Sequence, residues 1–269
     1  MSNQEMLLGG GFSEVPPFSA TGGTITTVGA DTVHIFTGSG SFVLSNPPIG
    51  FTVQYLVVAG GGGTFISASN EGCGGGGAGG FVYVASASMG AGTYTVTVGG
   101  GGAGNVNGSN SSITGLSVTA VGGGAGQLFD FGSSGGSGGG GGGFNTTRSG
   151  GSGTSGQGNG GGIGLNLGGG GGGGGAGSAG GNGSNPFGGS AGSGQSNSIS
   201  GTSAIYSVGG PGMGRFNFPS YAGTPATGGS SCDQSGAANT GNGGGAPFSN
   251  TTTINGGSGI VIIRYVTPT

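Results

Sequence analysis

The side chains with the clearest catalytic potential are one histidine and a nearby carboxylate. His34 lies three residues after Asp31, and serines occur throughout the chain, so a Ser-His-Asp triad can be drawn from the sequence. In such a triad the aspartate orients the histidine, and the histidine activates the serine. His34, however, stands between Val33 and Ile35 in a β-like run, and Asp31 belongs to a predicted Gly-Ala-Asp turn. The pattern favours a structural histidine.

A second motif of possible chemical interest is GxGxxG, which residues 151–156 match letter for letter. This motif binds a dinucleotide only where a strand leads into a helix within a βαβ unit. The chain has 83 glycines among 269 residues, so such matches arise by chance, and no βαβ unit is predicted around this one. We expect no dinucleotide and no other cofactor.

The inventory of ionisable groups excludes further classes of chemistry. Only 3% of the residues are charged, and the cations are Arg148, Arg215 and Arg264. Without lysine there is no Walker-type phosphate loop and no Schiff base. One histidine and two cysteines cannot build the usual zinc centres. The net charge of −3 offers no basic stripe for nucleic acid, and the six scattered carboxylates suggest neither a calcium repeat nor a glycosidase pair. The sequence predicts a protein that is not an enzyme.

Targeting features are equally sparse. Residues 1–10 lack a basic segment followed by an apolar segment, so no export signal is predicted. No stretch approaches the ~18 apolar residues of a membrane helix, and membrane insertion is not expected. In this setting Cys73 and Cys232 are expected as free thiols, with a bridge between them as the alternative.

The candidate binding residues lie in aromatic clusters that interrupt the glycine-rich text. Rings mixed with Asn, Ser and Arg supply rigid contact area and adaptable hydrogen bonds, which is the composition of a recognition surface. The alternative is that these clusters cap the ends of the glycine structure. The residues predicted to contact a receptor are Phe129, Asp130, Phe131, Arg215, Phe216, Asn217, Phe218 and Tyr221.

Two kinds of sequence segment must position these residues, and the first kind is strand-like. Segments rich in β-branched and aromatic residues cluster in the first 121 residues and the last ten. Residues 52–59 and 259–266 contain continuous apolar runs, typical of strands buried on both faces, whereas residues 93–98 alternate cleanly. Helical spacing appears nowhere. The predicted fold class is all-β, with a small antiparallel β-sandwich-like module and essentially no α-helix. The expected strands are residues 24–28, 32–37, 42–44, 52–59, 81–85, 93–98, 113–121 and 259–266.

The second kind of text is glycine, which dominates residues 122–257. Collagen is excluded because there is no Gly-X-Y period and only 10 prolines. A flexible linker is disfavoured by the low charge and the 31% hydrophobic content. A polyproline-II helix has three residues per turn and leaves its N–H and C=O groups pointing outward. Glycine would let such helices approach and exchange lateral hydrogen bonds. We therefore predict an inserted bundle of polyglycine-II helices.

The predicted organisation has three parts. Residues 1–20 form an N-terminal attachment segment. Residues 21–121 together with 258–269 form the β module with the first glycine loops, and residues 122–257 form the glycine-rich bundle.

Four motifs follow one another along the chain: FTGSGSF at residues 36–42, YLVVAGGGG at 55–63, GTYTVTVGG at 92–100 and GGSGIVIIRY at 256–265. Their order resembles the glycine-rich domain of bacteriophage tail-fibre and related virion proteins. The resemblance covers residues 20–265 and implies a β module joined to a polyglycine-II bundle. By analogy with the glycine-rich adhesins of T-even-like phages, it also implies that loops at the end of the bundle bind a bacterial surface receptor.

The resemblance further implies a virion component that is assembled in the host cytoplasm and acts outside it. Its other partners would be virion proteins bound through residues 1–20, in a multicopy arrangement such as a homotrimer. The sequence departs from the family in showing no trimerisation stalk, chaperone or baseplate-docking segment. A rival interpretation is a cellular extracellular or ice-binding scaffold, for which the Thr93, Thr95 and Thr97 ladder would be the exposed face.

Overall fold

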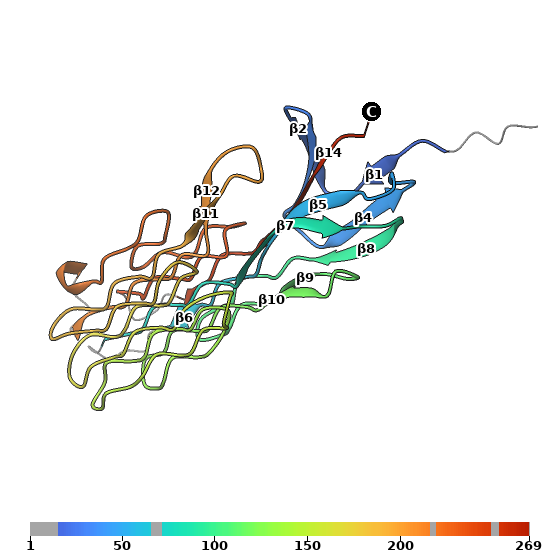
Figure 1. Cartoon of the computed structure of the whole chain (residues 1–269). Coiled ribbons are helices and arrows are strands. Elements are labelled where there is room, and N and C mark those ends of the chain that lie inside the picture. The colour runs from blue at the N-terminus through green and yellow to red at the C-terminus, as the bar shows by residue number, and fades with distance from the viewer. Residues whose placement is uncertain (1–15, 66–71, 216–218, 249–252, 269) are drawn as a thin grey trace, which may run out of the picture.

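The computed structural model describes residues 16–65, 72–215, 219–248 and 253–268. The two five-stranded sheets lie at one end of the molecule, and the glycine-rich chain runs back and forth beyond them (Figure 1). The described residues contain no α-helix, and Pro219–Tyr221 form a short 3-10 turn, η2. The all-β prediction is confirmed.

One five-stranded sheet has the order β1-β4-β8-β9-β10, and every neighbouring pair is antiparallel. The strands expected at residues 42–44 and 93–98 are present in this sheet. The single strand predicted at residues 113–121 is instead two short strands joined by a turn. Two residues in this turn have a positive φ, Gly115 at 90°, which favours glycine, and Ser117 at 50°. The strands are β1 (Ser19–Thr21), β4 (Gly40–Ser45), β8 (Gly92–Thr97), β9 (Ser111–Ile113) and β10 (Val118–Ala120).

The second five-stranded sheet has the order β2-β3-β14-β5-β7 and is also antiparallel throughout. The strand nearest the C-terminus, β14, therefore lies at its centre, between β3 and β5. The strands are β2 (Thr24–Val28), β3 (Asp31–Phe36), β5 (Thr52–Val58), β7 (Phe81–Ser88) and β14 (Ile260–Val266).

The two sheets face each other across an apolar core. Phe42 and Val96 come from the first sheet, and Val57 and Ile263 come from the second; all four are fully buried. Alternation places the other side chains of β8 in solvent, so Thr93, Thr95 and Thr97 are exposed as expected. The antiparallel sandwich is thus held together by side chains.

The outer face of the second sheet is also covered, which explains the continuous apolar runs. Leu56 and Ile262 point away from the sandwich core and pack with Ile199 and Tyr206. These last two belong to the segment that contains the hairpin of β11 (Gln195–Asn197) and β12 (Ala204–Tyr206). Strands β5 and β14 are consequently buried on both faces, as predicted.

His34 and Asp31, the two members of the hypothetical triad, have separate structural partners. The imidazole is fully buried in β3, and its Nδ1 lies 2.7 Å from the Gly22 carbonyl oxygen. Because a carbonyl only accepts, Nδ1 carries the proton, and Nε2 accepts from the Tyr265 hydroxyl at 3.0 Å. The Asp31 carboxylate instead binds Arg264 through Nη2 at 2.6 Å.

The buried imidazole predicts a pH dependence of stability. Burial is the main reason that the pKa of His34 lies below its usual 6.5, while the hydrogen bond to Gly22 opposes that shift. Below pH 6.5 the unfolded chain therefore binds a proton that the folded chain does not. We expect the free energy of unfolding to fall between pH 6.5 and 5, by at most about 1.4 kcal/mol per pH unit.

Urea denaturation at a series of pH values measures this slope. His34 is the only histidine in the chain, so a His34→Gln variant serves as the control and should lose the slope between pH 6.5 and 5. A wild-type stability that is constant or rising as the pH falls to 5 contradicts the prediction.

In the glycine-rich region the backbone hydrogen bonds run between segments, and they change partner from one residue to the next. Along residues 74–80 the same neighbouring segment recurs at every third amide. Three neighbours are therefore used in turn, with N···O distances of 2.8 to 3.0 Å. The bonds are Gly74 to Gln127, Gly75 to Gly171, Gly76 to Gly244, Gly77 to Gly124, Ala78 to Gly174, Gly79 to Gly241 and Gly80 to Val121, donor first.

This network does not begin at Gly122, where the bundle was predicted to start. Residues 59–63, 72–80 and 99–108 also bond to later glycine segments, as in Gly61 to Gly257 and Gly108 to Gly123. The short strands β6 (Thr64–Phe65) and β13 (Thr253–Ile254) pair in the same region. The β module and the glycine-rich region therefore share backbone hydrogen bonds.

Candidate functional site

Successive passages of the glycine-rich chain run in opposite directions. Each turn between them therefore lies either near the sheets or at the end remote from them. Residues 72–80 lead into β7, so residue 80 lies near the sheets and residue 72 lies far from them. Residues 121–127 run the opposite way beside them, because Gly80 bonds to Val121 and Gly74 to Gln127. The turn after Gln127 therefore lies at the end remote from the sheets, which we call the distal end (Figure 1).

The same reasoning places five turns at the distal end, and contacts connect them in sequence. We call residues 128–131, 144–147, 165–168, 184–187 and 219–221 the distal turns. The connecting contacts are the Phe129 and Phe144 rings at 4.9 Å, Leu167 N to Phe144 O at 3.4 Å, Gly169 N to Ser184 O at 2.9 Å, and the Phe187 and Tyr221 rings at 5.5 Å.

Several apolar side chains of the distal turns face solvent. Their exposed fractions lie between 37% and 61%. Exposed apolar side chains that gather in one place are typical of binding surfaces. The exposed residues are Phe129, Phe131, Leu165, Leu167 and Phe187.

A small buried cluster lies beneath this surface. Leu128 and Met213 pack with both cysteines, and Phe248 covers them in part. Both cysteines are free thiols, as expected. Burial raises the pKa of the Cys232 thiol to about 12, so this thiol is un-ionised and unreactive at neutral pH. Phe248 therefore fits the alternative interpretation, in which aromatic residues cap the end of the glycine-rich structure. Phe129, Phe131 and Phe187 remain exposed.

The predicted contact residues occupy different positions at the distal end. Phe129 and Phe131 are exposed, and the Asp130 carboxylate between them accepts a hydrogen bond from the Phe131 amide at 2.8 Å. Arg215 and Tyr221 are partly buried, and their backbones bond to Pro186 and Gly188. Phe216, Asn217 and Phe218 lie outside the described residues.

The sequence reasoning missed the aliphatic members of the surface. Leu165 and Leu167 were not predicted because they are not aromatic. The signal was present, since residues 163–167 read Ile-Gly-Leu-Asn-Leu and interrupt the glycine-rich region with three apolar side chains. Leu167 also has a φ of 52°, which marks the turn that keeps its side chain exposed.

The described distal turns present mainly apolar side chains and backbone groups. The carboxylate among them, on Asp130, accepts a hydrogen bond from its own loop. Across the described part of the chain, no three His, Cys, Asp or Glu side chains gather as a metal site would require. The same part holds no helix of the length and apolarity needed to cross a bilayer. The surface is suited to binding a partner through rings, aliphatic groups and backbone amides.

The sandwich and the cross-bonded glycine segments define a glycine-rich all-β protein. A family model described as a glycine-rich domain matches residues 36–266, which is most of the chain. The protein therefore belongs to the glycine-rich domain family. No curated protein matches the sequence.

Proposed function

We propose that this chain is a non-enzymatic structural protein of a phage particle, a tail-fibre or head-fibre adhesin. In this proposal the sandwich faces the particle and the distal turns face the host. Residues 1–20 would join the other virion proteins; residues 1–15 lie outside the described residues, and β1 begins at Ser19. The motif order at residues 36–42, 55–63, 92–100 and 256–265 supports this role through its resemblance to phage proteins.

The proposal includes a polyglycine-II bundle as the rigid support. A helix with three residues per turn presents every third amide to the same neighbour, which is the period of the bonds along residues 74–80. A Cβ on most of the glycines would come closer than 3.0 Å to a backbone atom of an adjacent segment. These two observations favour extended threefold helices over a pleated sheet, whose bonds would join only two neighbours.

The observation that carries the proposed function is the convergence of the distal turns. Residues from Phe129 to Tyr221 are separated by more than 90 positions in the sequence, yet their turns meet at one end of the molecule. That end is remote from the sandwich (Figure 1). A scaffold without a partner has no need to gather exposed apolar side chains there.

Binding of the purified chain to host cells tests this role. We expect the double variant Phe129→Ser, Phe131→Ser to bind at least about 30-fold more weakly, because each ring is a potential hot spot worth about 2 kcal/mol. The fluorescently labelled chain is titrated onto the bacterial host, and the bound fraction is measured after sedimentation.

The matched control is Ile49→Ser, which changes a fully exposed apolar side chain on the loop between β4 and β5. This variant should bind as the wild type does. Equal binding by the wild type and the double variant would remove the distal turns from the proposal.

The rival function, an extracellular or ice-binding scaffold, has one observation in its favour, the exposed threonine ladder on β8. The two functions are distinguished by labelling purified virions with an antibody to this chain and by measuring thermal hysteresis. Labelled particles without hysteresis support the virion protein, whereas hysteresis without labelled particles supports the scaffold.

A further inference from the structure

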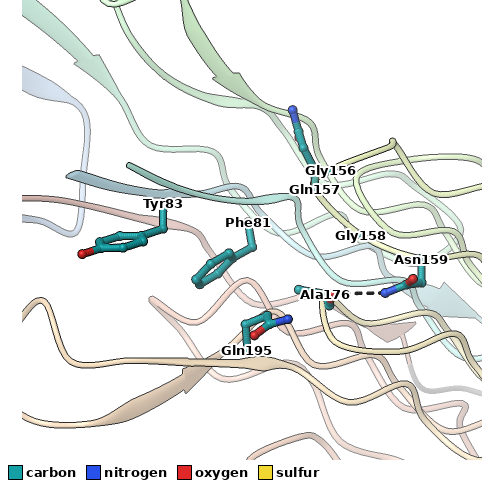
Figure 2. A pocket seen from close by; sticks show the side chains of 8 residues that line it. All are labelled: Phe81, Tyr83, Gly156, Gln157, Gly158, Asn159, Ala176 and Gln195. Carbon is teal, nitrogen blue, oxygen red and sulfur yellow. Dashed lines mark hydrogen bonds between the residues drawn. The ribbon is translucent and has the colours of Figure 1, made fainter. Parts of the chain in front are cut away.

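A groove lies where the second sheet meets the glycine-rich region, at the end of that region opposite the distal turns. Phe81 and Tyr83 stand two residues apart on β7, so their rings share one face of the strand, about 7 Å apart. Gln195 of β11 faces them, and Gly156, Gly158 and Asn159 complete the lining (Figure 2). This part of the groove encloses about 490 Å³.

The groove continues past Tyr83 along the same wall. A second cavity of about 400 Å³ is lined by Tyr83 and Gln54 on the sheet side, and by Ser196, Asn197 and Ser203 on the hairpin side. Because Tyr83 lines both cavities and Gln195 adjoins Ser196, the two form one elongated site. Its length suits a chain-like ligand better than a compact one.

Charge restricts the ligand to a neutral molecule. The one charged side chain in the linings is Arg264, and its Nε and Nη2 bind the Asp31 carboxylate at 2.7 and 2.6 Å. The pair leaves neither a free cation for phosphate or sulfate nor a free anion for a basic ligand. Among the described residues that line the two cavities there is no carboxylate, and so no acid pair of the kind that cleaves a glycoside.

Some polar side chains of the groove are hydrogen-bonded to the backbone around them, and others are available to a ligand. Gln157 uses both ends of its amide, accepting from Val121 N and donating to Thr119 O. Asn159 donates to Gly175 O and Ala176 O. Gln195, in contrast, is exposed, and its side-chain amide bonds to no other described residue. Tyr83 is 41% exposed and is bonded only to Gln54, over 3.3 Å.

We propose that this groove binds a neutral oligosaccharide. The aromatic faces of Phe81 and Tyr83 carry negative potential, which attracts the polarised C–H groups of a sugar face. Amide and hydroxyl groups both donate and accept, as a ring of sugar hydroxyls requires. A drug-like apolar ligand would need a predominantly hydrophobic pocket, which this lining does not provide. The proposal does not rest on receptor contact at the distal turns.

The test is an array of neutral oligosaccharides built from hexoses and N-acetylhexosamines, probed with the purified full chain. Glycans that bind are then titrated by calorimetry against variants. Tyr83→Ala should weaken binding tenfold or more, whereas Tyr83→Phe, which keeps the ring, should retain most of it. Gln195→Ala should weaken binding to a smaller extent. Tyr83 and Gln195 are exposed, so these variants should unfold at the wild-type temperature.

The control variant Phe131→Ala changes an exposed ring at the distal end and should bind the same glycans as the wild type. This control separates the groove from the proposed adhesin surface, because each site can fail alone. Absence of binding to every neutral glycan at millimolar concentration overturns the proposal. Equal affinities of wild type and Tyr83→Ala, or binding of anionic glycans only, overturn it as well.

Discussion

Replacing Gly171 with alanine should destabilise the protein by about 3 kcal/mol or more, although it adds a single methyl group. Gly171 donates to Gly141 and accepts from Gly75, each at 2.9 Å. A third neighbouring segment contains Gly162, and a Cβ added to Gly171 would overlap the carbonyl oxygen and carbon of that residue. The neighbouring backbone must move to make room, which stretches hydrogen bonds to two other segments. Overpacking alone costs about 1–3 kcal/mol, and the weakened bonds add to that.

The matched control is Gly100→Ala, within the same network. A Cβ on Gly100 would have open space around it, and its φ is outside the left-handed region. This variant should be neutral or more stable by about 0.4–1 kcal/mol, because alanine restricts the unfolded chain. Urea denaturation of both variants measures the difference. A Gly171→Ala protein as stable as Gly100→Ala would show that the segments are not packed against each other as described.

The second large effect on the free energy of unfolding should come from removing a buried side chain from the sandwich. Phe42 is fully buried between the sheets, with its ring 4.9 Å from that of His34 and 6.4 Å from that of Tyr94. Phe42→Ala leaves a cavity that the two rigid sheets cannot close, so we expect a loss of about 3–5 kcal/mol in the free energy of unfolding.

The control here is Ile49→Ala, which removes an apolar side chain that is fully exposed. Its free energy of unfolding should stay within about 0.5 kcal/mol of the wild type. If Phe42→Ala is as stable as this control, the sandwich is not held together by the core assigned to it. Denaturation curves of the two variants under identical conditions decide between these outcomes.

The two predictions describe two ways of stabilising one chain. In the sandwich, burial of Phe42, Val57 and Ile263 supplies the favourable free energy, and the backbone bonds follow the strands. In the glycine-rich region the backbone supplies the contacts itself, because the absence of side chains lets segments approach closely enough to satisfy each other's amides and carbonyls. The sandwich therefore loses stability when atoms are removed, and the glycine-rich region loses it when atoms are added.

Most of the sandwich was predictable from the sequence because its strands carry their own signals. Residues 24–28 and 93–98 are β-branched or aromatic, and 259–266 contains a continuous apolar run, so these three strands lie within one residue of their expected places. The short strand β1 carries no such signal and was not predicted. The hairpin at β11 and β12 was not predictable. Its first strand reads Gln-Ser-Asn, and it forms where the adjoining Ile199 and Tyr206 cover the sheet, which is a tertiary effect.

The candidate site was predictable in composition but not in place. Aromatic residues that interrupt glycine-rich sequence mark chain reversals, and Phe129, Phe131 and Phe187 lie in the segments defined above as the distal turns. These residues lie together at one end because of the number of residues in each passage of the glycine-rich chain and the adjacent segment to which each amide bonds. The groove beside Tyr83 depends on the hairpin and could not be anticipated for the same reason.

The central claim is that the glycine-rich region is held together by lateral hydrogen bonds between its main chains. Residue-resolved amide hydrogen exchange by NMR tests it most directly, at residues 74–80, 121–127 and 168–175. We expect these amides to exchange together and orders of magnitude more slowly than an unstructured chain, with protection comparable to that of strands β5 and β14. Exchange of these glycines at the unprotected rate, while the sandwich amides remain protected, would contradict the account.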